Sequence, residues 1–401
     1  MKKNLLLLLI ATLSPLIVVE IGLRVWVSMR VDTAPPIALK DKQLGWRPNP
    51  QHPDHDHNGF RNKSVPEQAD IVAMGDSQTY GMGVLPDQAW PQQLAALDNT
   101  TVYNLALGGY GPGHSLVLFD DALDLKPKLI IEAFYAGNDA FDAFQLVYDL
   151  KQNPNLKTTD PHEVAAIQQA EQQQSLIEKA EELYQRSTRQ DSTSLTTVDK
   201  AKQFMQNRLM IYHLFIQARN NYLEQSNTPA ANDLRWSIIK QNSFTQNGSR
   251  FAFEGGGGRT IFTPDYRLAA VDLNDPRIGE GHRIALEAIG QMKQQADEVD
   301  IQFAVLLIPT KELVFKDVVY QELADVPDNY RSLIEKEELF WQESKHFFTG
   351  QNITFLDTLP ALREVFQQGE QPYQLSRDGH PNHLGHQAIA ELVSSALLQQ
   401  D

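Results

Sequence analysis

A serine in a tight turn, Ser77, is the first residue whose surroundings suggest chemistry. The segment IVAMGDSQTYG, residues 71–81, is a short apolar run that ends in Gly-Asp-Ser. Two functions fit such a turn: presenting a serine nucleophile between a strand and a helix, or binding a phosphate at a helix N-terminus. A phosphate site would place several glycines before the helix and a lysine or a ribose-binding acid nearby. Gly81 and Gly83 come after the turn and no lysine is close, so the pattern favours the nucleophile.

Three other segments carry the groups that a serine nucleophile requires, namely a base, a residue that orients the base, and donors for the developing oxyanion. NLALGGYGPG contains Gly109, where a backbone N–H can approach a ligand without a side chain in the way. YAGNDAFD contains Asn138, a neutral amide donor. SRDGHPNHLGHQ contains Asp378 and His380 just before a predicted helix. Each segment follows a predicted strand or opens a helix, so we expect all of them at one edge of a sheet.

Simpler interpretations of these residues stay open. Asp76 would brace the turn after a strand, and Asn138 would be a helix N-cap. His383 and His386 follow His380 closely and would be helix-surface residues, although either one is an alternative candidate for the base.

Taken in order, the four segments resemble the four sequence blocks of the GDSL-type, or SGNH, hydrolases. The resemblance implies that Ser77 is the nucleophile and that its own backbone N–H is one oxyanion donor. It implies that the N–H of Gly109 and the side-chain amide of Asn138 are the other two donors. It further implies that His380 is the general base and that Asp378 orients it. We therefore expect a serine esterase or deacylase that acts on an acyl ester, such as an acetylated glycan outside the cytoplasm.

The resemblance covers roughly residues 55–148 and 255–395, and it has two departures. Gln78 stands where the family name has leucine, and the last block is spaced D-x-H instead of the commoner D-x-x-H. The D-x-H spacing is similar to the alginate O-acetyltransferase branch, as is PTKE at residues 309–312. Two alternatives therefore remain: a membrane-associated polysaccharide O-acetyltransferase with a membrane partner that donates the acyl group, and a non-catalytic glycan-binding or assembly module.

The fold class follows from short apolar runs separated by stretches long enough for helical crossovers, a pattern that predicts a buried parallel sheet. We expect an α/β domain of three-layer, flavodoxin-like (SGNH hydrolase) type over residues 66–149 and 251–401, with strand order 2-1-3-4-5. Residues 150–250 are rich in Gln and Asn and show apolar residues at helical spacing, which predicts a helical insertion. The glycines of residues 254–259 are expected to form a hinge. The five predicted strands are residues 70–75, 101–107, 129–137, 301–309 and 353–357.

The N-terminus predicts a membrane anchor. Lys2 and Lys3 precede a long apolar stretch without an A-x-A cleavage site, so residues 1–31 are expected to span a membrane once and to leave the catalytic body outside the cytoplasm. The alternative is a long signal peptide cleaved around residue 34. Residues 32–65 are rich in Pro, His, Asp and Asn and are expected to form an extended tether.

Composition excludes several other classes. A formal net charge of −16, with no cluster of basic residues, argues against a nucleic-acid partner. The absence of cysteine excludes disulfides, thiolate metal sites and a cysteine nucleophile. His52, His55 and His57 lie among acidic residues as in metal-binding tracts, but a solvated loop is the favoured interpretation. We expect no metal and no organic cofactor.

Overall fold

The computed structural model describes residues 35–188 and 249–399, together with short stretches at 14–15, 18–24, 219 and 228–241. The chain divides into two compact units. One unit contains Pro35–Arg189 and Asn247–Asp401, and it holds the sheet and every candidate catalytic residue. The other contains Met1–Ala34 and Gln190–Gln246. Within the latter, the structure describes α11 (Pro229–Gln241).

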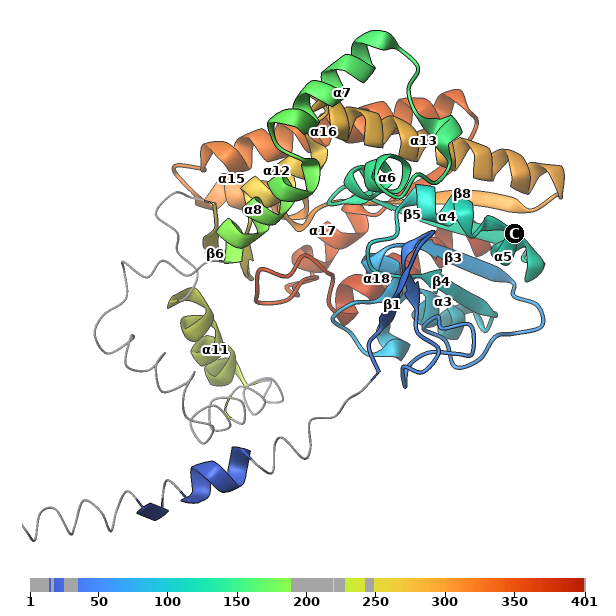
Figure 1. Ribbon diagram of the computed structural model, residues 1–401. Helices are drawn as coiled ribbons and strands as arrows, with labels where there is room; N and C mark the ends of the chain where they lie inside the picture. Colours follow the sequence, from blue (N-terminus) through green and yellow to red (C-terminus); the bar gives the residue numbers. More distant parts are fainter. Residues whose placement is uncertain are drawn as a thin grey trace, which may run out of the picture. The chain divides into compact units, whose positions relative to one another are not determined.

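The centre of the larger unit is a five-stranded parallel sheet (Figure 1) with the order β4-β3-β5-β8-β9. In chain order this is 2-1-3-4-5, so the predicted fold class and strand order are confirmed. Every residue of β3 and β5 is buried, which explains why these strands consist of apolar residues, apart from Glu132, instead of alternating. The strands are β3 (Ile71–Gly75), β4 (Val102–Ala106), β5 (Leu129–Tyr135), β8 (Gln302–Ile308) and β9 (Thr354–Asp357).

Helices cover both faces of this sheet (Figure 1), which makes the domain three-layered. The layer on one face contains α4 (Pro112–Val117), α5 (Phe119–Asp124), α6 (Asp139–Tyr148), α13 (Pro276–Glu298) and α16 (Asp328–Gly350). The other layer contains α3 (Trp90–Asp98), α17 (Leu359–Gln367) and α18 (His383–Val393). Short helices after the strand ends are α2 (Ser77–Tyr80), α14 (Lys311–Val314) and α15 (Lys316–Glu322).

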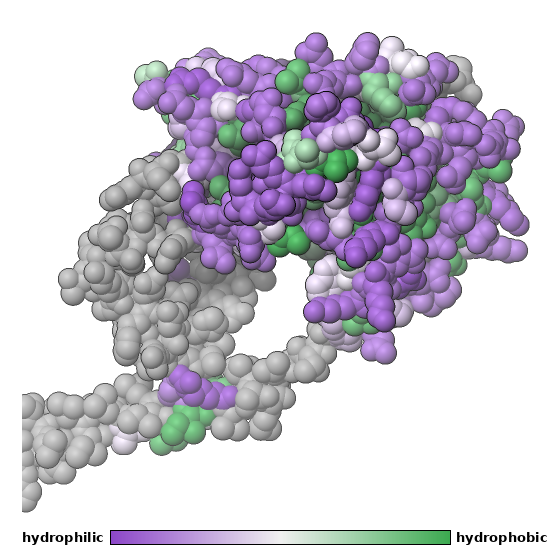
Figure 2. Space-filling model, turned by 45° about the horizontal axis from the view of Figure 1, so that its top comes forward, coloured by the Kyte–Doolittle hydropathy of each residue, from purple (hydrophilic) through white to green (hydrophobic). Residues whose placement is uncertain are grey.

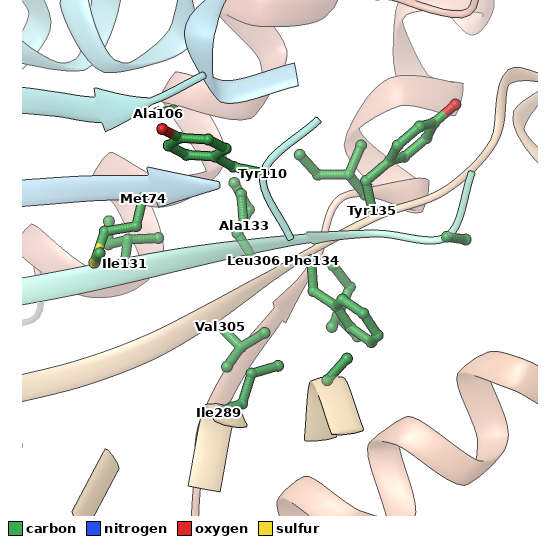
Figure 3. Packing of buried hydrophobic residues seen from close by; sticks show 14 of the residues in the cluster. Met74, Ala106, Tyr110, Ile131, Ala133, Phe134, Tyr135, Ile289, Val305 and Leu306 are labelled. Atoms are coloured by element: carbon green, nitrogen blue, oxygen red, sulfur yellow. The ribbon is translucent and has the colours of Figure 1, made fainter. Parts of the chain in front are cut away.

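The core lies between the layers. Figure 3 shows Met74, Ile131 and Val305 of three neighbouring strands with Ile289 of α13, and all four are buried. The outer surface is different: on the face in Figure 2, hydrophilic residues predominate and hydrophobic ones gather only in small separate groups. This distribution agrees with the ordinary apolar content and the negative net charge of the chain.

The long connection between β5 and β8 is not a single insertion over residues 150–250. Its first part forms α7 (Pro161–Gln173) and α8 (Leu176–Thr188), which belong to the unit that contains the sheet. The chain then contributes residues 190–246 to the other unit.

The glycine-rich segment at residues 254–259 is a hairpin turn and not the hinge that we expected. It joins the antiparallel strands β6 (Phe251–Gly255) and β7 (Gly258–Phe262). Gly256 and Gly257 have φ angles of +57° and +83°, a left-handed pair that tight two-residue hairpins require and that glycine adopts without strain. α12 (Pro264–Val271) follows this hairpin.

The tether prediction for residues 32–65 is wrong from residue 35 onward. The segment forms the hairpin of β1 (Ala38–Asp41) and β2 (Gly45–Pro48) and then packs on the sheet unit. Arg61 is buried, and its guanidinium donates to the carbonyl oxygens of Tyr80, Gly81 and Val84. These polar residues are ordered by hydrogen bonds to distant backbone, which composition alone does not reveal.

The predicted membrane anchor, residues 1–31, falls mostly outside the described residues. In the parts of the chain that the structure describes, no helix combines the length and the apolar character needed to span a bilayer.

Candidate active site

The turn after β3 presents Ser77. Gly75 has φ +137°, and a Cβ there would come within 3.0 Å of both the Cβ and the carbonyl oxygen of Ala133 on β5, so only glycine fits this close approach. Asp76 accepts a hydrogen bond from the N–H of Gln78 at 2.8 Å and caps α2, in agreement with its interpretation as a brace. Both neighbours of Ser77 are buried, whereas the serine itself is partly exposed.

The structure brings Ser77, His380 and Asp378 together as a hydrogen-bonded chain. The Nε2 atom of His380 lies 2.8 Å from Ser77 Oγ. On the other side of the ring, Nδ1 lies 2.5 Å from Asp378 Oδ1, which also accepts from the backbone N–H of His380 at 3.0 Å. Burial raises the pKa of Asp378, but the hydrogen bonds and charge of His380 outweigh it and bring this pKa down to about 2. The carboxylate is therefore ionised at neutral pH and holds the imidazole with Nε2 facing the serine.

The other two histidine candidates are not in this position. His386 is fully buried, its Nδ1 accepts from the N–H of Trp90, and burial lowers its pKa to about 3. His383 is exposed at the start of α18. His380 is thus the histidine that contacts the serine.

Asn138 lies at the N-cap position of α6, but its side chain makes no capping hydrogen bond. Instead, its Nδ2 atom donates to Asp142 Oδ2 at 2.5 Å. An amide nitrogen carries two hydrogens, and the Asn138 amide also interacts with the carboxyl group of Asp76, an interaction that acts to lower the Asp76 pKa against the larger effect of burial. The simple N-cap interpretation therefore accounts for the backbone position and not for the side chain.

The glycine segment after β4 lies beside the serine. A Cβ on Gly108 would be 3.6 Å from Ser77 Cβ, and Gly109 adopts φ +85° with nothing within 4 Å of where its Cβ would be. Among the described residues, none accepts a hydrogen bond from the backbone N–H of Ser77 or of Gly109. Both N–H groups can therefore donate to a ligand atom, and their roles as oxyanion donors stay predictions.

A buried lysine that the sequence analysis did not single out holds the loop of Asp378 and His380. Lys311, in the PTKE segment, is fully buried, and its Nζ atom donates to the carbonyl oxygens of Ile261 (3.0 Å), Ser376 (2.9 Å) and Asp378 (2.9 Å). All three ammonium hydrogens are thus used. Burial lowers the pKa of Lys311 to about 8. The lysine joins the loop to β7. Its signals in the sequence are its place shortly after a buried strand and its membership of the PTKE segment.

Buried carboxyl groups lie in and around the serine turn, and of these the sequence analysis considered only Asp76. Burial raises the pKa of Glu132, in the middle of β5, to about 8 and the pKa of Asp142 also to about 8. Burial likewise raises the pKa of Asp76 and of Asp139, which accepts from the N–H of Tyr135 at 2.7 Å. Because these groups lie close together and out of water, protonation relieves their mutual repulsion.

The histidine tract near residue 55 has a structural explanation. The two ring nitrogens of His55 hydrogen-bond the carbonyl of Asn49 and the hydroxyl of Tyr80, both at 2.8 Å. No group of three or more potential metal-binding side chains gathers within the described part of the chain.

Among known proteins, the chain is similar to several solved structures. No protein-family model matches the chain, and no curated protein matches it. A protein from Desulfitobacterium hafniense assigned to a lipolytic G-D-S-L family is 14% identical, with a TM-score of 0.35, over 82% of this chain and 98% of the other. A GDSL-like lipase from Bacteroides thetaiotaomicron is 10% identical, with a TM-score of 0.32, over 83% and 91%. An extracellular lipase from Streptomyces rimosus is 13% identical, with a TM-score of 0.32, over 82% and 99%.

The fold and the site define a three-layer α/β domain with a Ser-His-Asp triad at the carboxyl end of its sheet. Open α/β sheets bind their ligands at this edge.

Proposed function

We propose that the protein is a serine esterase or deacylase that cleaves an acyl ester through a covalent intermediate on Ser77. The observation that carries the proposal is the continuous chain of hydrogen bonds from Ser77 Oγ through the His380 ring to Asp378. A nucleophile, a base and a group that orients the base, each within hydrogen-bond distance of the next, are the requirements of acyl transfer to serine.

The first half of the reaction forms the acyl-enzyme. His380 Nε2 takes the proton of Ser77 Oγ as this oxygen attacks the ester carbonyl carbon. The negative charge that develops on the carbonyl oxygen is stabilised by the N–H groups of Ser77 and Gly109 and by the amide of Asn138. The tetrahedral intermediate then collapses, its bond to the alcohol oxygen breaks, and the imidazolium gives its proton to the leaving alcohol.

The second half regenerates the serine. His380 takes a proton from a water molecule that attacks the acyl carbon, and the imidazolium then protonates Ser77 Oγ as the carboxylic acid leaves. Asp378 stays ionised throughout and stabilises the imidazolium in both halves.

We place this activity outside the cytoplasm, on the acyl ester of an exported glycan, with the chain anchored by one N-terminal membrane helix. The support is the apolar stretch within residues 1–31 and the lysines before it. The D-x-H spacing of Asp378 and His380 favours a second candidate, an O-acetyltransferase in which a sugar hydroxyl replaces water in the second half-reaction and a membrane partner donates the acyl group.

The direct test is hydrolysis of p-nitrophenyl acetate by the full-length protein and by Ser77→Ala, with Ser395→Ala as a matched control at an exposed position. The proposal requires hydrolysis that is lost in Ser77→Ala and kept in Ser395→Ala. Release of the acyl group only when a sugar acceptor is added would favour the transferase. Absence of any acyl-enzyme would leave a non-catalytic glycan-binding module.

A further inference from the structure

A small cavity lies directly beside Asn138. It lies between α6, α8 and α12, has a volume of about 50 Å³, and is lined by Gly137, Asn138, Phe141, Ala180, Tyr266 and Ala269 among others. None of these residues belongs to the triad. The two helices α8 and α12 come from the long connection between β5 and β8, so the cavity is built by a part of the chain outside the sheet.

Two sets of contacts link the lining of the cavity to the loops that carry the site. On one side, Gly137 and Asn138 belong to the turn that presents the amide proposed to bind the oxyanion. On the other side, the ring of Tyr266 lies 5.2 Å from the guanidinium of Arg267. That guanidinium donates to the Gly137 carbonyl at 3.4 Å, and a Cβ on Gly379 would lie only 2.4 Å from its Nη2.

Gly379 is the residue between Asp378 and His380, so Arg267 joins the wall of the cavity to the loop of the catalytic base. When the Asn138 amide binds the ester carbonyl oxygen, as proposed above, the cavity is the hollow next to that amide into which a group bonded to the carbonyl carbon can extend.

The lining selects an uncharged group. Among the described side chains of the cavity wall, Lys179 alone carries a charge, and its ammonium is paired with Asp275 at 2.8 Å. Phe141, Ala180 and Ala269 offer no hydrogen-bonding side chain. The only cationic side chain among the described lining residues already has a carboxylate partner in Asp275, so a carboxylate on the acyl chain would compete with Asp275 for it.

The volume of the cavity limits the length of the acyl chain that fits into it. One enclosed water needs about 10–15 Å³ by this kind of measure, so the cavity holds the equivalent of roughly three to five water-sized groups. We propose that this cavity receives the acyl chain of the substrate and that it selects short, uncharged acyl groups of about two to four carbons. This inference rests on the proposed esterase function and specifies its substrate class.

The test compares p-nitrophenyl acetate, butyrate and octanoate with the full-length protein and with two variants that change the cavity in opposite directions. Ala180→Leu fills it and is expected to lower kcat/KM for butyrate at least tenfold more than for acetate, because a methylene group in a hydrophobic pocket discriminates by about 10- to 200-fold. Phe141→Ala enlarges it and is expected to raise the ratio of octanoate to acetate at least tenfold. Ala166→Leu, at an exposed position on α7, is the control and is expected to change neither ratio.

The outcomes of this test distinguish a wrong assignment of the cavity from a wrong proposed function. If hydrolysis depends on Ser77 but the chain-length profile is the same in Ala180→Leu, Phe141→Ala and the wild type, the cavity assignment is overturned while the esterase stands. If the wild type hydrolyses octanoate as fast as acetate, the assignment is also overturned. If no ester is hydrolysed and a fluorophosphonate labels no serine, the proposed function fails and the inference fails with it.

Discussion

The Nε2 atom of His380 lies 2.8 Å from the Oγ atom of Ser77, although 303 positions separate the two residues in the chain. The parallel sheet explains the contact, because Ser77 follows the carboxyl end of the interior strand β3 and His380 lies in the loop before α18, which packs on the same side of the sheet as α3. Residues at this edge meet irrespective of their distance in the chain.

Replacing the base tests this contact first. His380→Ala is expected to lower kcat for ester hydrolysis by about 10²- to 10⁴-fold, the usual contribution of a positioned general base. His383→Ala, at an exposed position three residues later, is expected to change kcat less than twofold. Steady-state kinetics of both variants with p-nitrophenyl acetate provide the measurement, and equal losses in the two variants would show that His380 has no special role.

The proposed oxyanion donor gives a second prediction. Asn138→Ala is expected to lower kcat by about 10²- to 10³-fold, as is typical when one such donor is removed. The same substitution also breaks the bond from Asn138 to Asp142. Asp142→Ala breaks that bond from the other side and keeps the amide, so it is the matched control and is expected to cost much less. If both variants lose activity equally, activity depends on the hydrogen bond between Asn138 and Asp142, and the oxyanion role of the Asn138 amide is refuted.

Lys311 is expected to be a positioning residue. Lys311→Met removes the donor to three carbonyl oxygens, two of them in the loop of the triad acid. We expect kcat to fall at least tenfold with a smaller change in KM, because the loop loses its fixed position while the substrate pocket keeps its walls.

The stability of this variant is measured beside its kinetics, since each buried group left unpaired costs about 1–3 kcal/mol. Lys316→Met, which removes a lysine in a surface ion pair on α15, is the control. An unchanged kcat in a folded Lys311→Met protein would refute the positioning role.

The raised pKa of Glu132 predicts that the stability of the folded protein depends on pH. Its pKa is raised by burial to about 8, above the ordinary value of about 4.3, so between these values the folded state binds more protons than the unfolded state. The contribution of Glu132 to the free energy of unfolding is therefore complete below about pH 4, and it is lost as the pH rises toward 8.

We expect the melting temperature of the wild type to fall between pH 5 and pH 8.5, and Glu132→Gln to reduce that fall, because glutamine cannot ionise. Glu364→Gln, at an exposed position on α17, is expected to leave the pH profile unchanged. Thermal unfolding at a series of pH values tests this, and an identical slope in Glu132→Gln and the wild type would contradict it.

Much of the fold is predictable because its signal is local. Strands such as Leu129–Tyr135 are buried along their whole length, so they appear in the sequence as short apolar runs, and their spacing specifies a parallel sheet. The candidate triad was found for a related reason, since polar residues directly after such runs lie at one edge of the sheet. The structure places Ser77, His380 and Asp378 in one hydrogen-bonded chain.

What the sequence did not reveal depends on partners that are distant in the chain. Arg61 looks like a loop residue until its guanidinium is seen to bind the carbonyls of the turn after α2. Lys311 and Glu132 look like ordinary charged residues of a helix start and a strand, and only packing buries them. The cavity beside Asn138 requires the arrangement of three helices, which apolar periodicity does not specify.

The measurement that tests the central claim most directly is covalent labelling of the full-length protein with a fluorophosphonate, followed by mass spectrometry of its peptides. We predict one adduct per chain, on the peptide that contains Ser77, forming at least a hundredfold more slowly in His380→Ala, since the attacking oxygen needs the base. An adduct on another residue, or labelling of Ser77 at the same rate without His380, would contradict the account.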